Sequence, residues 1–490
     1  MIRIEEEALR CLLCEDAPCS KACTGADPAR AVRALRFQNP SLARKLFREC
    51  SEQDLEKAEK ACIHYDLPLR LREIAAATTA QTTGDYIDPS EGPSLEIDFC
   101  GMHCENPFFL ASSAICTGYD MIARAFKAGW AGVFYKTITT QDIREVSPRF
   151  DTVNNGTRPG EFIGFRNMEQ LSENPADEDF EILKRLKKEF PTKIVIASIM
   201  GSTEEEWGIL AKKAQDAGLD AVELNFSCPQ MRVSGLGSDI GQNPELVALY
   251  TAYVKTHVSI PVIPKMTPNI MHMDQPAMAA FIGGATAISA INTIKSVTMN
   301  PEAEVSGKRI VSGYSGRAVK PIALRHILEM ATSPLLGGFP LSGIGGIETW
   351  RDALDYIQLG CSNVQVCTAV MEYGYRIIDD LKGGLQNYMK ERGITSLKDL
   401  VGEELPNFTL AGGLDRDTVV FPVINKDRCI GCGRCHVSCQ DGGHQAIIFG
   451  EDRMPKINGS RCVGCHLCRL VCPTKAISSS KRVKKRERTL

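Results

Sequence analysis

The sequence has no apolar run approaching the ~20 residues that a membrane-spanning helix requires. It also has little excess of charge, because 57 Lys and Arg residues face 60 Asp and Glu residues, which leaves a net charge of −3. This balance gives no general argument for binding to nucleic acid or to a membrane surface. The first residues, MIRIEEEALR, are acidic where a secretory signal is basic and then apolar. We therefore expect a cytoplasmic protein whose binding sites have to be found locally.

The chain also lacks the fingerprint of a dinucleotide-binding domain, since no Gly-x-Gly-x-x-Gly opens a strand–helix unit. Cysteine, in contrast, is abundant, with 20 in 490 residues. In a chain without a secretory signal, such a number favours metal ligation and a few buried or catalytic thiols over disulfides.

Two copies of one cysteine spacing lie near the C-terminus. They are Cys429-x₂-Cys432-x₂-Cys435-x₃-Cys439 and Cys462-x₂-Cys465-x₂-Cys468-x₃-Cys472. In this spacing, typical of two-cluster ferredoxins, the first three thiolates bind one cluster and the fourth binds the other. The spacing therefore predicts two [4Fe–4S] clusters, one held by Cys429, Cys432, Cys435 and Cys472, the other by Cys462, Cys465, Cys468 and Cys439. A pair of zinc knuckles is the alternative.

A different spacing lies near the N-terminus, where Cys11, Cys14, Cys19 and Cys23 follow one another closely and Cys62 lies downstream. It predicts a further [4Fe–4S] cluster. Cys11, Cys14 and Cys19 supply three ligands, and either Cys23 or Cys62 supplies the last, because the final thiol of such a run often serves a neighbouring cluster. A zinc-bound helical domain is the alternative.

Eight short β-branched segments alternate with helical segments in the middle of the chain. They are 108–113, 132–137, 193–200, 221–227, 261–267, 287–292, 340–347 and 363–370. Eight strand–helix units over ~300 residues fit a (β/α)₈ TIM barrel better than an open doubly wound sheet. The active site then lies where the strands end, and the long connections 138–177 and 293–319 are expected to cover a substrate.

The predicted domains follow from these patterns. They are a cysteine-rich helical domain at 1–75, a linker at 76–92, the barrel at 93–395, a connector at 396–420, a ferredoxin-like domain at 421–478 and a basic tail at 479–490. The tail has no aromatic residue among its charges, so we interpret it as a disordered, solubilising end.

Glycines and lysines at the predicted strand ends indicate a phosphate-containing cofactor. Gly343, Gly345 and Gly346 precede a helix after the seventh strand, the usual place of a phosphate in such barrels. Lys136 and Lys265 end two other strands, where they can stabilise negative charge on a reduced flavin. Clusters that carry single electrons and a flavin that collects two describe an electron-transfer chain leading to a hydride donor.

Segments along the whole barrel carry a resemblance to a known family. They are NPFFLASS, FYKT, NMEQ, ELNFSCPQ, KMTPN, INT, GYSG, RAVKPIALR and SGIGGIE. From about residue 93 to 478 the chain resembles the pyrimidine-reducing part of dihydropyrimidine dehydrogenases, in particular the bacterial NAD-dependent type, which works with a separate flavoprotein subunit. Residues 11–75 resemble a smaller version of the N-terminal cluster domain of that family. The later cluster ligands of this chain do not all match those of the family.

The resemblance implies reduction of uracil or thymine to the 5,6-dihydropyrimidine, or the reverse, in pyrimidine catabolism. It implies a hetero-oligomer with an FAD-containing partner that oxidises NAD(P)H. It implies FMN held by Ala111, Ser112, Lys136, Thr137, Lys265, Gly316, Gly345, Gly346 and Thr368. It implies a pyrimidine pocket formed by Asn167, Glu169, Asn225, Ser227, Asn292 and Thr293, in which amide side chains both donate and accept hydrogen bonds.

Cys228, in the segment ELNFSCPQ, lies outside every metal-type spacing. Reduction of a ring C=C bond needs a hydride and a proton, and a flavin supplies only the hydride. A thiol with a pKa near the usual ~8.5 is protonated at pH 7 and can act as a general acid. Gly235 and Gly237 allow the loop after Cys228 to close over a substrate. The resemblance gives this cysteine the same role; a small buried thiol at a strand end is the alternative.

Two other functions compete with this interpretation. A dihydroorotate dehydrogenase shares the barrel, FMN and an Asn-x-Ser-Cys-Pro element, but an orotate site needs a cation for its carboxylate and usually has Asn where this chain has Gln230. The second alternative is a non-catalytic electron-transfer subunit in which the barrel is only a scaffold.

Overall fold

The computed structural model describes residues 4–64, 66–82, 84, 86, 88, 91–155, 162–229, 235–299 and 308–485. The chain divides into two compact units, Met1–Leu405 and Pro406–Leu490. The first contains a helical domain and the barrel, and the second contains the C-terminal cysteines.

The larger unit is built around a closed barrel of eight parallel strands, as predicted. The sheet closes because β4 pairs with β3 on one side and with β8 on the other. β8 is buried at every position, which explains its continuous apolar sequence IVIASIM. The strands are β3 (Phe108–Leu110), β4 (Gly132–Phe134), β8 (Ile194–Met200), β9 (Ala221–Asn225), β10 (Val262–Lys265), β11 (Ile288–Ala290), β14 (Leu341–Ile344) and β15 (Cys361–Val366).

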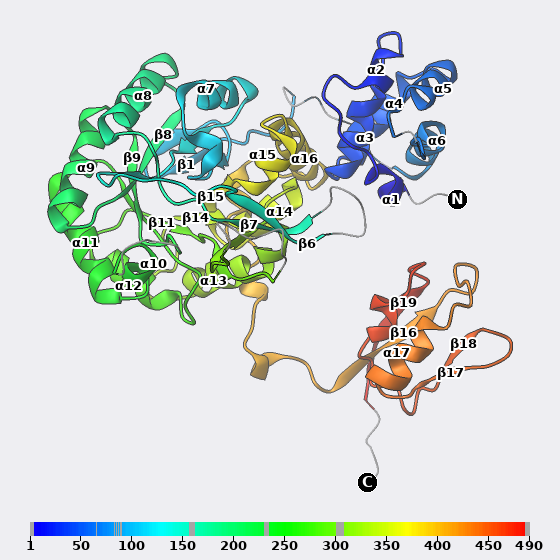
Figure 1. Cartoon of the computed structure of the whole chain (residues 1–490). Coiled ribbons are helices and arrows are strands. Elements are labelled where there is room, and N and C mark those ends of the chain that lie inside the picture. The colour runs from blue at the N-terminus through cyan, green and yellow to red at the C-terminus, as the bar shows by residue number, and fades with distance from the viewer. Residues whose placement is uncertain are drawn as a thin grey trace. The chain divides into compact units, whose positions relative to one another are not determined.

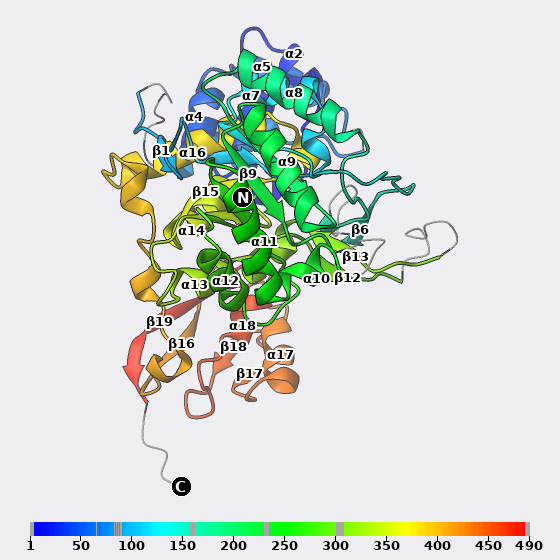
Figure 2. The same ribbon diagram turned by 90° about the vertical axis from the view of Figure 1, so that its left-hand side faces the viewer.

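Helices surround this barrel (Figures 1 and 2). Their first turns are fixed locally: the Thr203 side chain caps α9, and Thr349 with Asp352 forms a capping box on α14. The helices are α7 (Tyr119–Ala128), α8 (Ala176–Glu189), α9 (Glu204–Asp216), α10 (Ser238–Gly241), α11 (Pro244–His257), α12 (Asp274–Ile282), α13 (Lys320–Ala331), α14 (Trp350–Gln358), α15 (Thr368–Tyr373) and α16 (Ile377–Glu391).

The two long connections form regular structure together. They contribute β6 (Phe150–Asn155), β7 (Phe162–Asn167), β12 (Ile294–Ser296) and β13 (Ser312–Ser315), which make one four-stranded sheet in the order β12-β13-β7-β6. The central pair, β7 and β13, comes from different connections and is antiparallel. Each connection therefore supplies a hydrogen-bonding edge to the other. The short strand β5 (Ile138–Thr139) extends the first connection along β8.

The N-terminal helical domain packs on the barrel unit. Its helices are α1 (Ile4–Ala8), α2 (Pro18–Lys21), α3 (Pro28–Arg36), α4 (Pro40–Arg48), α5 (Glu52–Lys60) and α6 (Leu71–Gln81). The Asn39 amide donates to the Asp380 carbonyl over 2.9 Å, and the Trp350 indole donates to the Gln38 carbonyl over 3.0 Å. The hairpin of β1 (Ile97–Phe99) and β2 (Met102–Cys104) then leads into the barrel.

Two boundaries in this unit differ from the predicted ones. Helix α6 runs to Gln81, so the helical domain does not end at 75; the alanine-rich segment that suggested a linker is a good helix former. After 395, Leu397 and Leu400 are fully buried in the barrel core, so the predicted connector begins as part of the barrel unit.

The C-terminal unit is a small α+β domain. It contains β16 (Thr418–Ile424), α17 (Arg434–Gly442), β17 (Ile447–Phe449), β18 (Pro455–Ile457), α18 (Leu467–Leu470) and β19 (Ile477–Lys484). The antiparallel pair β16–β19 corrects the interpretation of the tail: residues 479–484 lie in a strand, and its lysines and arginine are exposed on that strand. A strand can carry such charges because its backbone makes the pairing and the charged side chains point to solvent. A run of charged residues therefore does not exclude a strand.

None of the helices in the described part of the chain is long and apolar enough to cross a membrane.

Candidate active site and cluster sites

A deep cavity lies at the carboxyl ends of the barrel strands. It contains about 1070 Å³ of space free of protein atoms, part of it open to solvent. Side chains of the four-stranded sheet also line it, among them Phe150, Phe165 and Tyr314. The long connections thus provide a wall of the cavity.

The cavity brings together the FMN- and pyrimidine-binding residues that the resemblance implies, with one exception; Gly343, of the predicted phosphate end, does not line it. Its lining includes Ala111, Ser112, Lys136, Thr137, Asn167, Glu169, Asn225, Cys228, Lys265, Asn292, Thr293, Gly316, Gly345, Gly346 and Thr368. The exception is Ser227, which is fully buried behind the wall and contacts the lining residues instead.

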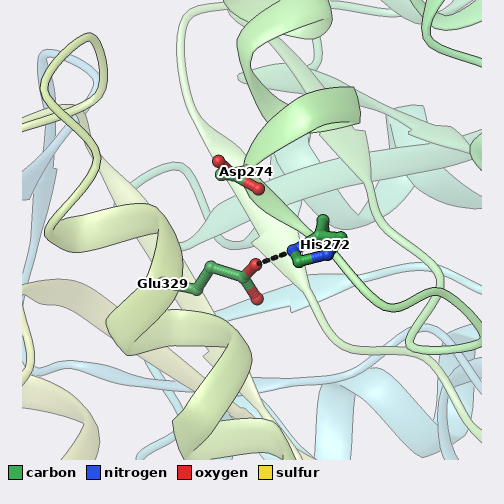
Figure 3. A group of neighbouring side chains, drawn as sticks. All are labelled: His272, Asp274 and Glu329. Carbon is green, nitrogen blue, oxygen red and sulfur yellow. Dashed lines mark ion pairs between the residues drawn. The ribbon is translucent and has the colours of Figure 1, made fainter. Parts of the chain in front are cut away.

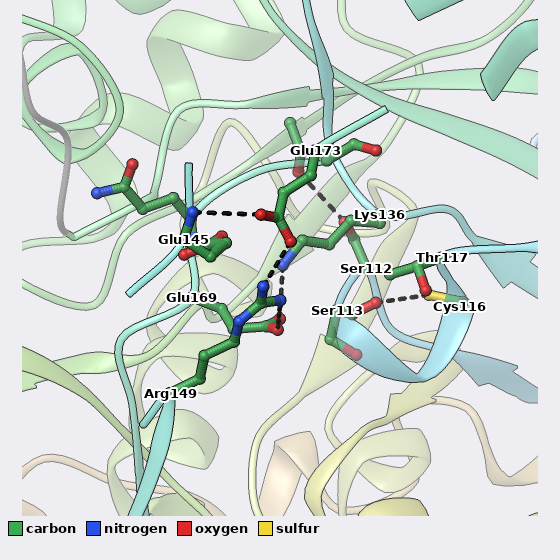
Figure 4. Close-up of polar contacts among 12 residues, drawn as sticks. Ser112, Ser113, Cys116, Thr117, Lys136, Glu145, Arg149, Glu169 and Glu173 are labelled. Carbon is green, nitrogen blue, oxygen red and sulfur yellow. Dashed lines mark hydrogen bonds and ion pairs between the residues drawn. The ribbon is translucent and has the colours of Figure 1, made fainter. Parts of the chain in front are cut away.

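One side of the cavity carries a group of charges centred on Glu169 (Figure 4). The Lys136 Nζ atom lies 2.6 Å from one carboxylate oxygen of Glu169, and an Arg149 Nη atom lies 3.2 Å from the other. Arg149 also binds Glu173. Lys136 is therefore neutralised and held in place by a carboxylate at the cavity wall, a partner that the sequence did not indicate.

Lys265 enters the cavity from a buried polar network inside the barrel. Its Nζ atom lies 3.8 Å from Glu223, which is fully buried. The Ser289 hydroxyl donates to Glu223 over 3.0 Å, and Gln365 donates to Ser289 over 2.9 Å. A buried carboxylate requires such partners. The network holds one oxygen of Glu223, and the other oxygen faces Lys265 as an ion pair.

A second network joins the amide side chains at the cavity floor. The Asn225 amide donates to Thr137 over 2.9 Å, and its carbonyl oxygen accepts from Ser227 over 2.8 Å. The Asn292 amide donates to Ser227 over 2.9 Å. Ser227 thus holds the side chains of Asn225 and Asn292 in one orientation. The amide groups that these hydrogen bonds do not use therefore have fixed directions.

Cys228 lies directly after this network and is 4% exposed. Its carbonyl accepts a hydrogen bond from the Ser238 backbone N–H over 2.9 Å, which ties the start of its loop to α10. Gly235 and Gly237 have φ angles of +87° and +58°, values that only glycine adopts easily. The rest of the predicted closing loop, residues 230–234, lies outside the described residues.

Gly345 and Gly346 are packed so closely that neither position has room for a side chain. A Cβ atom on Gly346, where φ is +69°, would lie 2.8 Å from the Lys320 Cβ and 2.9 Å from the Gly316 carbonyl. Such a close backbone approach next to a cavity suits a phosphate. The glycine-lined end, two lysines and a long apolar-walled cavity fit a flavin mononucleotide.

Glu348 also lines the cavity and was not predicted from the sequence. It pairs with Arg317 over 3.1 Å. Burial raises its pKa to about 7, and the nearby carboxylate of Glu372 adds to this effect. Its position two residues after the paired glycines, at the end of the segment SGIGGIE, was the available signal.

Two smaller cavities in the C-terminal unit each collect four cysteines. One is lined by Cys429, Cys432, Cys435 and Cys472, and the other by Cys439, Cys462, Cys465 and Cys468. These are the two groupings expected from the spacing. Backbone N–H groups of Ala446 and Ala476 donate to the sulfur atoms of Cys439 and Cys472, each over 3.3 Å. The donor sets and apolar surroundings fit two [4Fe–4S] clusters.

The N-terminal cysteines divide into two groups. Burial raises the pKa of Cys19 to about 11, with contributions from the neighbouring thiols of Cys11, Cys62 and Cys14. Cys23 is placed differently: its thiol hydrogen-bonds to the carbonyls of Cys19 and Asp54, and its neighbouring thiol is Cys50. The structure therefore brings Cys62, not Cys23, to the other three.

Two family models match the chain. The model of dihydroorotate dehydrogenase matches residues 94–389, and that of a 4Fe-4S dicluster domain matches residues 422–479. The chain belongs to the dihydroorotate dehydrogenase family. The first match covers the barrel and the second confirms the predicted two-cluster domain; both leave out the N-terminal helical domain.

Three similar proteins carry names of two enzyme types. The NAD-dependent dihydropyrimidine dehydrogenase subunit PreA of Escherichia coli K12 is 50% identical over 364 residues, or 73% of this chain and 88% of that protein. The chloroplastic dihydropyrimidine dehydrogenase (NADP(+)) of Arabidopsis thaliana is 36% identical over 65% of this chain and 78% of its own length. The dihydroorotate dehydrogenase B catalytic subunit of Pyrococcus abyssi is 38% identical over 63% and 98%. The predicted resemblance and the oxidoreductase class are confirmed.

Proposed function

We propose that this chain interconverts uracil or thymine and the 5,6-dihydropyrimidine, with FMN bound in the barrel cavity. The observation that carries the proposal is the cavity itself, whose wall holds Cys228, Asn225 and Asn292 together with Lys136 and Lys265. The 50% identity to a protein named as a dihydropyrimidine dehydrogenase subunit supports it.

The polar lining suits a flat ring that has two carbonyls and two N–H groups. Asn167, Asn225 and Asn292 line the cavity, and each amide offers both a donor and an acceptor. Because Ser227 engages Asn225 and Asn292 from behind, these two side chains are oriented before a ligand arrives. Preorganised groups of this kind lower the entropic cost of binding.

FMN, when bound, supplies the hydride to one carbon of the ring. Gly316, Gly345 and Gly346 would lie at its phosphate, and Lys136 and Lys265 at its ring system. Cys228 gives the proton to the adjacent carbon from its Sγ atom and recovers a proton from solvent through its loop. The wall formed by Phe150, Phe165 and Tyr314 limits the access of water to the ring.

Electrons reach this site through the [4Fe–4S] clusters. The described part of the chain has no Gly-rich nucleotide loop between a strand and a helix of the kind that holds NAD. We therefore infer a hetero-oligomer with a partner that binds FAD and oxidises NAD(P)H. The word "subunit" in the name of the Escherichia coli relative supports an assembly of this kind.

Dihydroorotate is the competing substrate, since the dihydroorotate dehydrogenase of Pyrococcus abyssi is also similar. Among the described lining residues, the cations are Lys136 and Lys265. Both face carboxylates, Glu169 and Glu223. No cation in that part of the wall is left for the extra carboxylate of orotate, which favours uracil and thymine.

The experiment is an anaerobic preparation with iron, sulfide and FMN counts, followed by reduction of uracil, thymine and orotate with an artificial electron donor. We expect turnover with uracil or thymine and less than about 1% of that rate with orotate. Preferred reduction of orotate would contradict the proposal. Clusters without FMN, and no turnover with any substrate, would favour a non-catalytic electron-transfer subunit.

A further inference from the structure

A second group of metal-type side chains lies away from the active-site cavity, between α12 and α13 (Figure 3). His272 and Asp274 lie where the β10–α12 connection enters α12, and Glu329 lies on α13. One ligand atom from each lies within 4.8 Å of the other two. The His272 Nδ1 atom lies 3.5 Å from an oxygen of Glu329.

A fourth side chain, His326, faces this group from one turn earlier on α13. It is 1% exposed, and its Nδ1 atom lies 3.7 Å from the second oxygen of Glu329. A backbone hydrogen bond to Pro268 engages the ring. Because Nδ1 has no hydrogen-bond partner, that bond comes from Nε2. This fixes the tautomer with a free lone pair on Nδ1.

Several buried acceptors in this group lack a hydrogen-bond partner. Glu329 Oε2, Asp274 Oδ1 and His326 Nδ1 are buried atoms without a hydrogen-bond partner. Leaving a buried acceptor unsatisfied costs about 1–3 kcal/mol. Two acceptors that face each other, as His326 and Glu329 do, favour a cation or a proton between them; the Arg325 guanidinium lies beside this pair, 3.3 Å from Glu329 Oε2.

We propose that His272, Asp274, Glu329 and His326 form a binding site for a divalent transition-metal ion, with Zn²⁺ as the best fit. Two imidazole nitrogens and two carboxylate oxygens make a donor set that suits Zn²⁺. With bonds of about 2.0–2.1 Å, tetrahedral ligand atoms lie roughly 3.3–3.4 Å apart. The 3.5 Å between His272 Nδ1 and one oxygen of Glu329 is close to this value, and His326 Nδ1 lies 3.7 Å from the other oxygen. The ligand atoms of His272, Asp274 and Glu329 lie within 4.8 Å of one another, so an ion would draw them closer together.

The site has a role in holding the barrel rim. The connection that carries His272 starts immediately after Lys265, and its Asn269 donates to the Thr293 carbonyl over 3.3 Å. A metal ion would tie the far end of this connection to α13. We infer a structural ion that stabilises the loop behind the cavity without contacting the substrate.

Arg325 competes with the proposed ion for the carboxylate of Glu329. Its Nη2 atom lies 3.3 Å from Glu329 Oε2, outside hydrogen-bond geometry, and the same guanidinium binds the Met271 carbonyl. The side chain is 48% exposed, so it can turn into solvent when a cation arrives. Replacing it by a neutral residue should strengthen metal binding by about tenfold, since one positive charge is removed from the neighbourhood of another.

The test measures Zn²⁺ on the cluster-loaded protein, with iron counted in the same sample. We expect the wild type to retain one equivalent after dialysis against metal-free buffer. His272→Ala, at a 65% exposed position, should weaken binding about 100-fold or more. Arg325→Gln should strengthen it. His103→Ala is the matched control, because this 73% exposed histidine also faces a glutamate, at 3.8 Å.

X-ray absorption at the zinc edge separates this site from the cysteine sites. Nitrogen and oxygen ligands alone support the proposal, and sulfur ligands overturn it. Equal binding by the wild type and His272→Ala, or no binding at all, also overturns it and leaves a proton on Glu329 as the bridge. Added Zn²⁺ should raise the unfolding temperature of the wild type and of His103→Ala, but not that of His272→Ala.

Discussion

The Nζ atom of Lys136 lies 2.6 Å from the Oε2 atom of Glu169, and the two side chains are only 7% and 10% exposed. The positive charge that the sequence offers at the end of β4 is therefore paired with a negative charge within the same cavity. The Glu169 carboxylate therefore reduces the ability of Lys136 to stabilise a further negative charge in the cavity. A reduced flavin anion next to Lys136 would share that lysine with Glu169.

The first prediction concerns Glu169→Gln. Loss of the carboxylate leaves the Lys136 charge available to the cofactor, so the reduced, anionic form is favoured and the midpoint potential rises. One charge in a partly shielded site changes the energy by roughly 1–2 kcal/mol, or about 20–45 mV for two electrons. Spectroelectrochemical titration of the bound flavin measures this shift. Glu173→Gln, which leaves the Lys136 pair intact, is the control, and an unchanged or lower potential in Glu169→Gln would contradict the explanation.

The second prediction concerns Cys228. Cys228→Ala and Cys228→Ser should lower pyrimidine turnover by about 10²–10⁴-fold, since this is the usual contribution of a positioned general acid. Serine keeps the size of the side chain but is a far weaker acid. Flavin content and perturbation of the flavin spectrum by uracil should stay normal in both variants. Cys367→Ser provides a control at another cysteine of the same cavity. Turnover within threefold of the wild type in Cys228→Ser would refute the role.

The barrel was predictable because its signals are local. The strands are short buried runs, as in the segment IVIASIM of β8, and helical segments follow them, some with a side-chain cap such as Thr203 on α9. The site residues were predictable because they stand at strand ends or in the segments of the resembling family. Their convergence on one cavity follows from the parallel barrel, in which all strands end at the same face.

The features that could not be predicted from the sequence depend on contacts between residues that are distant in the chain. Glu223, Ser289 and Gln365 each look like an isolated polar residue in a strand, and only barrel closure connects them beneath Lys265. The β7–β13 pairing joins segments about 150 residues apart, so neither connection shows by itself that it forms a sheet. Likewise, the exposed strand β19 has no apolar alternation to reveal it.

The third prediction concerns the N-terminal cysteines. Since Cys62 lies with Cys11, Cys14 and Cys19, Cys62→Ser should lower the iron content by about four atoms per chain, the content of one [4Fe–4S] cluster. Cys23→Ser should leave it unchanged, because the Cys23 thiol is bonded to backbone carbonyls. Iron and sulfide counts together with electron paramagnetic resonance of the reduced protein distinguish the two variants. Loss of iron in Cys23→Ser with full iron in Cys62→Ser would reverse the assignment.

The last prediction concerns Glu348 and the dependence of stability on pH. The pKa of this carboxyl is raised from 4.5 to about 7, mainly by burial, so between these values the folded protein binds more protons here than the unfolded chain. Stability must then fall as the pH rises through this window, by at most about 3 kcal/mol. Glu348→Gln cannot ionise and should not lose this contribution, so its unfolding temperature relative to the wild type should rise between pH 5 and pH 8. Glu245→Gln, at an exposed helix start, is the control and should track the wild type. Parallel curves for Glu348→Gln and the wild type would show that Glu348 ionises normally, with the Arg317 pair at 3.1 Å offsetting its burial in full.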